Sequence, residues 1–234
     1  KSYSSSQNLQ FEEDWKAGHI LYEMTNRRDD ERTISYAESH DQALVGDKTI
    51  IFRLADADMY WHFEHGHSTY MVDRAIALHK MIRLITASTI NGGVLPDFPR
   101  QGNGWSCKYA RRQWSLVDNP NFYYADLNRF DEAMVHMLRK KLQEVKDGNG
   151  THLPYIYKLW DNEGDQVVAF QRGKLIFVFN WNGQKSFADY GFLAPEGKYR
   201  VVLDTDAKQF AGFGQNNDTI EHFTQHDELY AQDG

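Results

Sequence analysis

Five consecutive polar residues, Glu38 to Gln42, are the part of this chain best suited to do chemistry. They follow a short apolar run, Ile34–Ala37, which predicts a buried strand. Burying so many polar side chains is costly and adds little to a hydrophobic core. Polar groups at the carboxyl end of a barrel strand instead face the barrel mouth, where such folds collect their catalytic groups. The sequence therefore predicts a site for a polar ligand at residues 38–42.

Asp41 is the strongest catalytic candidate in this run. A carboxylate at a strand end, beside His40, can stabilise the positive charge that develops when a glycosidic bond breaks and the sugar becomes oxocarbenium-like. On the local pattern alone, Asp41 could equally be a helix cap or an ordinary loop carboxylate. The residues by themselves leave both interpretations open.

A second candidate region combines two indoles, fork-shaped guanidinium donors and an amide within ten residues. Its members are Trp105, Arg111, Arg112, Gln113 and Trp114. Such groups suit the hydroxyls and ring faces of neutral sugars. The same groups could instead form a buried network that locks a long loop, and this alternative is at least as well supported.

Three histidines, His62, His65 and His67, lie close to Glu64 and raise the question of a metal site. Their spacing matches no strong zinc pattern, so a solvated loop is the preferred interpretation, and we expect neither a metal nor another cofactor. A metalloenzyme built on this cluster remains a rival that predicts stoichiometric zinc. Two further histidines, His79 and His136, are expected to be packed or surface residues of helices.

Composition limits the classes of partner. The chain has 234 residues and a formal net charge of -7, which argues against binding to a nucleic-acid backbone. No apolar run reaches the length that a membrane helix needs, so no membrane partner is expected. The one cysteine, Cys107, cannot form an internal disulfide, which fits a reducing compartment and a cytoplasmic location. Aromatic residues make up 14% of the chain, and although most should be core, such rings suit carbohydrate.

The periodicity of apolar residues changes along the chain. Helical spacing predicts helices over 11–25, 71–87 and 124–146. The last of these should bury a stripe made of Leu127, Phe130, Met134, Met137 and Leu138. After a glycine-rich break at 147–151, alternation with a period of two predicts a β-hairpin over 166–180, with its turn at Arg172 and Gly173, and a strand over 199–203. The sequence thus predicts a mixed helix and strand segment, residues 1–147, followed by an all-β domain, residues 148–234.

Several motifs together resemble those of glycogen and starch branching enzymes, members of the α-amylase superfamily. They are Thr25-Asn-Arg-Arg28, Thr33-Ile-Ser-Tyr-Ala-Glu-Ser-His-Asp-Gln42, Val45-Gly-Asp-Lys-Thr49, Asp73-Arg-Ala-Ile-Ala-Leu-His-Lys-Met81, Asp97-Phe-Pro-Arg100, Gly102-Asn-Gly-Trp-Ser106, Arg111-Arg-Gln-Trp-Ser-Leu-Val-Asp118 and Gly197-Lys-Tyr-Arg-Val201. The resemblance runs with interruptions from about Trp15 to Phe223, and the first two motifs together are highly specific.

The resemblance implies an α/β fold: the C-terminal part of a (β/α)8 TIM barrel, followed by an all-β, sandwich-like domain. It implies transfer of a cleaved α-1,4-glucan segment to a 6-hydroxyl by retaining double displacement. Asp41 then corresponds to the transition-state stabiliser, and His40 and Glu38 to substrate-binding residues. Trp105, Arg112, Gln113 and Trp114 are further candidates for substrate contacts. The implied partner is an α-1,4-glucan such as glycogen, amylose or amylopectin.

Two departures from the family pattern matter for activity. The family's nucleophile and acid/base carboxylates correspond to positions upstream of Lys1, and no local match for either is found. Between Gly93 and Asp97 only three residues stand in place of the family's apolar strand and the motif that follows it. We therefore expect a fragment that is inactive alone, with a strand at 34–37 that lacks neighbours and calls for the missing N-terminal part as a partner. The alternative is a non-catalytic glucan-binding or regulatory protein.

Overall fold

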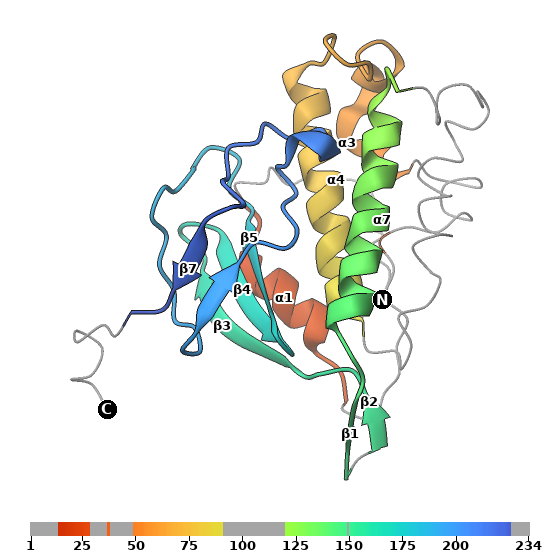
Figure 1. Cartoon of the computed structure of the whole chain (residues 1–234). Coiled ribbons are helices and arrows are strands. Elements are labelled where there is room, and N and C mark those ends of the chain that lie inside the picture. The colour runs from red at the N-terminus through yellow and green to blue at the C-terminus, as the bar shows by residue number, and fades with distance from the viewer. Residues whose placement is uncertain (1–13, 29–36, 38–48, 91–119, 149, 226–234) are drawn as a thin grey trace.

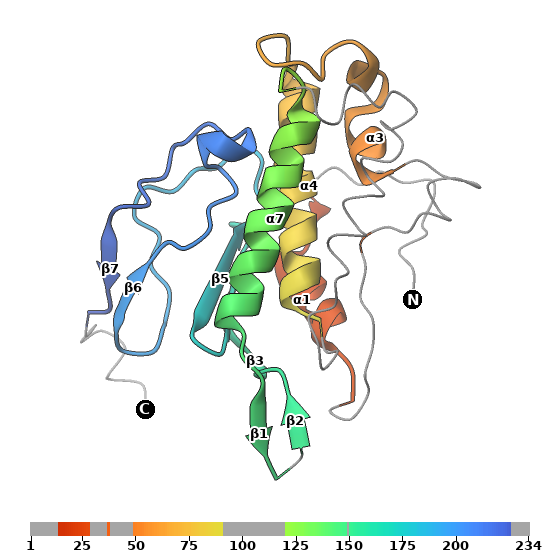
Figure 2. The ribbon, with the colours of Figure 1, turned by 45° about the vertical axis from the view of Figure 1, so that its right-hand side comes forward.

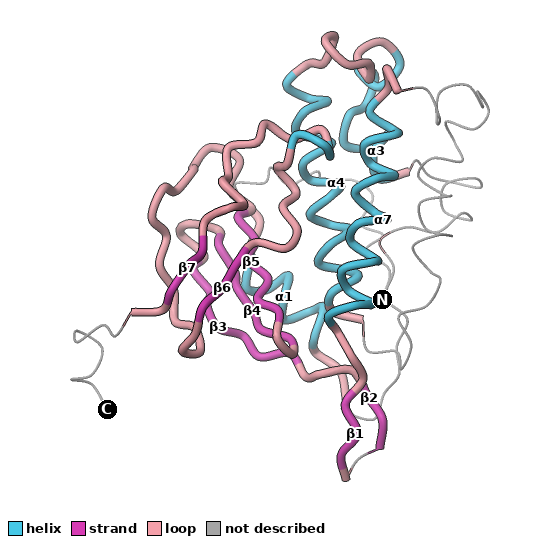
Figure 3. Tube along the Cα trace, in the orientation of Figure 1, coloured by secondary structure: helices cyan, strands magenta, loops and turns pink. Residues whose placement is uncertain are grey.

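The computed structural model of the chain describes residues 14–28, 37, 49–90, 120–148 and 150–225. Three helices, α3, α4 and α7, stand side by side, and a three-stranded sheet lies next to them (Figures 1 and 2). Helix α1 packs against the strands β3 and β4. All described α-helices lie before residue 142 and all described strands after residue 144 (Figure 3). We call residues 14–142 the helical part and residues 143–225 the β part.

The helical part contains α1 (Ala17–Thr25), α3 (Ile50–Ala55), the 3-10 helix η2 (Asp56–Tyr60), α4 (Tyr70–Ser88) and α7 (Tyr123–Lys141). The predicted helix over 71–87 is confirmed as α4, and the one over 11–25 is confirmed over Ala17–Thr25. The Thr69 side chain accepts a hydrogen bond from the Val72 amide and so caps α4. Helix α3 was not predicted, because six residues are too few for helical periodicity to be recognised.

The predicted end of α7 at residue 146 is wrong. The helix ends at Lys141, and the next residue, Leu142, has a non-helical backbone. Strand β1 (Val145–Asp147) then pairs antiparallel with β2 (Gly150–His152), so the glycine-rich segment belongs to a small hairpin. The predicted buried stripe of α7 is confirmed at Leu127, Phe130, Met134, Met137 and Leu138.

The main sheet of the β part has the order β3 (Ile156–Asn162), β4 (Val167–Arg172), β5 (Leu175–Asn180), and all its pairs are antiparallel. The predicted hairpin over 166–180 is confirmed, but its turn lies one residue later than expected. Arg172 pairs with Leu175, which leaves Gly173 and Lys174 at the turn. Gly173 takes a φ of 58°, a backbone conformation that glycine adopts at little cost.

A second, two-stranded sheet pairs β6 (Lys198–Arg200) with β7 (Glu221–Phe223). The strand predicted over 199–203 is thus confirmed only over its first two residues. A short 3-10 helix, η4 (Lys208–Phe210), connects the β part to the helices, because Phe210 packs edge-on against Phe130 of α7 at 5.5 Å between ring centroids.

One hydrophobic core joins the two parts. Residues with alternating exposure in β5 show how the sheet contributes: Leu175, Phe177 and Phe179 are buried, whereas Val178 is exposed. The buried face carries Phe170 stacked on Phe177 at 5.0 Å, and it belongs to the same cluster as the buried residues of α4 and α7. The predicted barrel strand over 34–37 lies outside the described residues except for Ala37, so the barrel stays a prediction. The described helices are all too short or too polar to cross a lipid bilayer.

Candidate functional site

The residues that the sequence proposes for chemistry lie outside the described part of the chain. These are Glu38, His40 and Asp41, and also Trp105, Arg112, Gln113 and Trp114. Their roles stay predictions. The structure does describe the elements directly before and after the two segments that carry them, and these elements are held by specific contacts.

The carboxyl end of α4 leads into the segment that carries Trp105 and Arg112, and two arginines bind this end. Arg172 of β4 donates from Nη1 to the Ser88 carbonyl at 2.5 Å and from Nε to the Pro154 carbonyl at 2.9 Å. Arg27, just after α1, donates from Nη2 to the Thr89 carbonyl. A helix carboxyl end carries partial negative charge, so two cations there are favourable.

Burial, and to a smaller extent the nearby charge of Arg27, lowers the pKa of Arg172 to about 10. Burial also lowers the pKa of Arg27. A guanidinium with a pKa near 10 is still protonated at neutral pH, so Arg172 keeps its charge beside the end of α4. The end of α4 is therefore fixed from two directions, by the residue that precedes the segment containing Asp41 and by the β part.

Further along α4, two more charged side chains are buried. Arg83 Nη2 lies 3.0 Å from Asp131 Oδ2 of α7. Burial raises the pKa of the Asp131 carboxyl, and the charge and hydrogen bond of Arg83 oppose that shift. Because neither side chain is exposed, this ion pair positions the two helices and leaves no open group for a ligand.

Lys80 ties α4 to the β part. Its Nζ donates to the carbonyls of Thr205 at 2.5 Å and Phe210 at 2.7 Å. Burial lowers the pKa of Lys80 to about 8, and the carboxylates of Asp206, Asp204 and Asp126, in that order, oppose the shift. The three buried cations Lys80, Arg83 and Arg172 thus all fix α4 against its neighbours.

The two helix histidines are as predicted, one packed and one at the surface. His79 is buried, and its Nδ1 atom has no hydrogen-bond partner among the described residues. Burial, followed by the charges of Arg83 and Lys80, lowers its pKa to about 3, so the ring is neutral at physiological pH. His136 of α7 is exposed.

The histidines of the 62–67 loop point to different partners. His62 Nδ1 lies 3.1 Å from the His67 carbonyl, which is a contact within the loop. His65 Nε2 lies 2.5 Å from Asp126 Oδ2 of α7, and its ring stacks on Tyr123 at 4.4 Å. The described residues contain no group of three or more metal-ligating side chains. Of the three, His65 holds the loop on α7, and His62 makes a contact within the loop.

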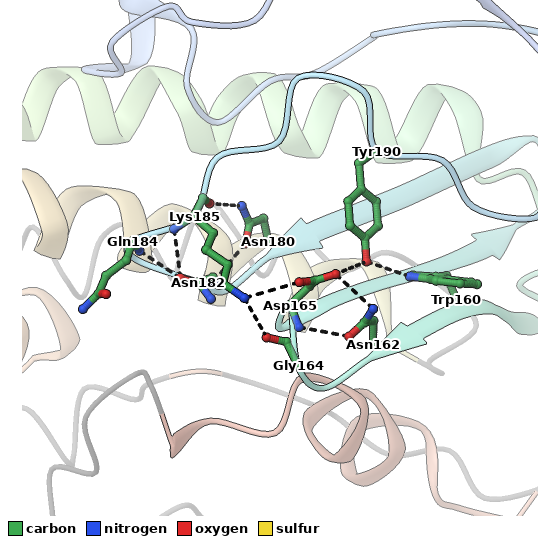
Figure 4. Close-up of polar contacts among 9 residues, drawn as sticks. All are labelled: Trp160, Asn162, Gly164, Asp165, Asn180, Asn182, Gln184, Lys185 and Tyr190. Carbon is green, nitrogen blue, oxygen red and sulfur yellow. Dashed lines mark hydrogen bonds and ion pairs between the residues drawn. The ribbon is translucent and has the colours of Figure 1, made fainter.

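A polar network that the sequence reasoning missed surrounds the turn between β3 and β4 (Figure 4). Asp165 Oδ2 accepts from Asn162 Nδ2 at 3.0 Å and from the Tyr190 hydroxyl at 3.2 Å, and that hydroxyl accepts from Trp160 Nε1 at 3.0 Å. Lys185 Nζ lies 3.4 Å from Asp165 Oδ1. The groups satisfy one another, so the network orders the turn and the loop after β5. The sequence shows only the Asn-x-x-Asp spacing of Asn162 and Asp165, which are close in the chain.

Comparison with known proteins confirms the resemblance over most of the chain. Residues 157–233 match the family model described as the alpha amylase C-terminal all-beta domain. The chain is 44% identical over 223 residues to a protein of Yarrowia lipolytica named 1,4-alpha-glucan-branching enzyme, covering 87% of this chain and 30% of that protein. Proteins of the same name from Felis catus and Saccharomyces cerevisiae are 43% and 40% identical, over 92% and 91% of this chain. The chain spans about a third of the length of the curated relatives it matches.

Proposed function

We propose, from this similarity to branching enzymes, that the chain supplies the last part of a (β/α)8 barrel and the following all-β domain to a 1,4-α-glucan-branching activity. That activity cleaves an α-1,4 linkage, holds the released segment covalently on the enzyme, and transfers it to a 6-hydroxyl. The observation that carries the proposal is the 40–44% identity to proteins of that name over about nine-tenths of the chain. The polar run at residues 38–42 supplies the chemistry.

In this role Asp41 stabilises the positive charge of the transition state, and His40 and Glu38 contact the sugar at the cleavage point. A retaining transfer also needs a nucleophile and an acid/base carboxylate. The chain has no local match for either, which fits its span of about a third of its relatives. The remaining two carboxylates come from a polypeptide region that this chain does not include.

The described structure is compatible with the barrel. In a (β/α)8 barrel the helices form an outer ring, and neighbouring helices lie side by side as α4 and α7 do (Figure 2). Arg27 and Arg172 both donate hydrogen bonds to the carboxyl end of α4. Arg27 lies just before the segment that carries Asp41, and the end of α4 lies just before the segment that carries Trp105. A rigid mounting of this kind serves a site whose groups must be placed to within a fraction of an ångström.

Reconstitution tests the proposal. The chain is co-expressed with the part of the Yarrowia lipolytica enzyme that it does not match, and branching of amylose is followed by the iodine absorbance. Neither part alone should shift the spectrum, and the pair should. Asp41→Asn in the pair should lower the rate at least ~100-fold, since it removes a charge aimed at the transition state. The matched control is Asp189→Asn, an exposed carboxylate of the β part, which should keep the rate.

Two results would overturn the proposal. One is branching by the isolated chain, which would show that the nucleophile and acid/base are present here. The other is a reconstituted Asp41→Asn pair that branches amylose as fast as the wild-type pair.

A second candidate is a non-catalytic glucan-binding or regulatory protein. It is favoured by the all-β domain match, residues 157–233, together with the lack of a match for two catalytic carboxylates. Reading the coding sequence upstream of Lys1 separates the two. An open frame that carries the two carboxylates supports the enzyme, and a stop or an unrelated segment supports the binding protein.

A further inference from the structure

The connection from α3 to the first residue of α4 displays the three most exposed large hydrophobic side chains of the described residues. Trp61 is 79% exposed, Tyr70 71% and Tyr60 70%. The loop, coloured orange, lies beyond the ends of the upright helices at the top of Figures 1 and 2. We call residues 56–70 the aromatic loop. Exposing three large rings so fully needs an explanation, because each would gain free energy from burial.

Specific contacts fix the backbone of the aromatic loop, so the exposure of its rings does not come from a loosely held backbone. The Thr69 hydroxyl donates to Asp58 Oδ2 at 2.6 Å and closes the base of the loop. Phe63 is buried and packs against Tyr124 of α7 at 4.5 Å between ring centroids. The His65 amide donates to the Asn121 carbonyl at 2.8 Å. A loop held at three places has little backbone entropy left to lose on binding.

Two of the three rings, Trp61 and Tyr70, are related through a hydrogen bond between Asp58 and Thr69. In a 3-10 helix, residues three apart share a face, and this relates Asp58 to Trp61 at the end of η2. The Asp58 carboxylate binds Thr69, whose neighbour is Tyr70. Side chains in the first turn of a helix lean toward its N-terminus, so the Tyr70 ring leans toward the loop. Trp61 and Tyr70 therefore flank the same hydrogen bond.

The charge around the rings selects the kind of partner. Between Arg53 and Arg74 the sequence has no lysine or arginine and four acidic residues, Asp56, Asp58, Glu64 and Asp73. A nucleic acid or an anionic membrane needs basic residues, and a second copy would bring the same negative charges. Tyrosine and tryptophan combine flat apolar faces with polar edges, which match the apolar faces and hydroxyl rims of sugar rings. A neutral polyhydroxylated chain fits these features.

We propose that the aromatic loop is an additional binding surface for α-1,4-glucan, on which sugar rings stack against Trp61, Tyr60 and Tyr70. The choice of an α-glucan rests on the proposed function. Such a surface would hold a long substrate at a second place besides the candidate site at Asp41. It makes no bond and breaks none, so it acts on binding alone.

Native affinity electrophoresis of the chain tests this proposal, with amylopectin in the gel. The wild-type chain should be retarded relative to a gel without polysaccharide. Trp61→Ala should raise the apparent dissociation constant roughly fivefold, as expected for the loss of one stacked ring, and a triple Tyr60→Ala, Trp61→Ala, Tyr70→Ala variant should abolish the retardation. Trp61→Phe retains a ring and should keep most of the binding. Because the three side chains are exposed, the melting temperature should stay within about a degree or two of the wild type.

The control removes exposed rings elsewhere. Phe213→Ala and Phe223→Ala, whose side chains are 61% and 64% exposed in the β part, should leave the retardation unchanged. A triple variant retarded as strongly as the wild type would overturn the inference, and so would a wild-type chain that is not retarded. A triple variant that changes only the oligomeric state in gel filtration would assign the rings to self-association and overturn it too.

The outcome is separable from that of the proposed function. Asp41→Asn tests catalysis in the reconstituted pair, and the triple variant tests binding by the chain alone. If branching requires Asp41 but the triple variant is retarded as strongly as the wild type, only the proposal for the aromatic loop is refuted. If the triple variant loses its retardation but the Asp41→Asn pair is fully active, only the catalytic proposal is refuted.

Discussion

The helical part and the β part are stabilised in different ways. In the helical part, α4 buries three ionisable side chains, His79, Lys80 and Arg83, and two of them make bonds to other elements. In the β part, the buried face of the sheet is built from stacked rings: Phe179 lies 6.0 Å from Phe170 and 5.8 Å from Trp181. Its one buried cation, Arg172, reaches across to α4.

This difference shows how each part is positioned. Stacked rings contribute area and tolerate small changes of shape, because dispersion and burial are not directional. Buried charges are stable only with their partners in place, so they define the position of α4 more strictly. The stricter part is the one from whose helix ends the two candidate segments depart.

Removing one partner of the buried ion pair should have the largest effect. Asp131→Leu leaves Arg83 buried without its carboxylate, so the free energy of unfolding should fall by about 3–5 kcal/mol. Urea denaturation followed by circular dichroism measures it. Glu132→Gln, an exposed change at the next position of α7, is the control and should stay within about 0.5 kcal/mol of the wild type.

The double variant Arg83→Met, Asp131→Leu sharpens the same test. With both charges gone, most of the lost stability should return, because an apolar pair of similar volume avoids the desolvation of two ions. A double variant as unstable as Asp131→Leu would mean that α4 and α7 need the ion pair itself.

Acid should weaken the helical part through His79. The folded-state pKa of about 3 lies below the usual value of 6.5, so the unfolded chain binds the extra proton between these values. Stability from this group is therefore present above pH 6.5 and is lost as the pH falls toward 3. At pH 5 the loss should be about 2 kcal/mol, from about 1.4 kcal/mol per pH unit.

His79→Leu isolates that contribution. Between pH 7 and pH 5 its unfolding free energy should fall by about 2 kcal/mol less than that of the wild type, measured by urea denaturation at each pH. Parallel curves for the two proteins would show that His79 titrates alike in the folded and unfolded chains.

The same difference explains what the sequence could predict. Alternating apolar residues located the β4–β5 hairpin to within one residue, because the pattern and the turn glycine are both local. The end of α7 was missed because the pairing of Val145 with His152 competes with helix propensity there. No local pattern joins Lys80 to Thr205 or Arg172 to Ser88, which are 125 and 84 residues apart. The candidate site at residues 38–41 was proposed from a motif, and both the site and its geometry stay predictions.

The smallest effect should come from the β part. Phe170→Leu replaces a fully buried ring, stacked at 5.0 Å on Phe177, by a smaller apolar side chain. The sheet can close around it, so the free energy of unfolding should fall by only about 1–1.5 kcal/mol, measured by the same urea titration. The comparison depends on this value being well below that of Asp131→Leu. A loss of about 4 kcal/mol or more at Phe170 would show that the stacked rings define position as strictly as the buried charges, and the proposed distinction between the two parts would not hold.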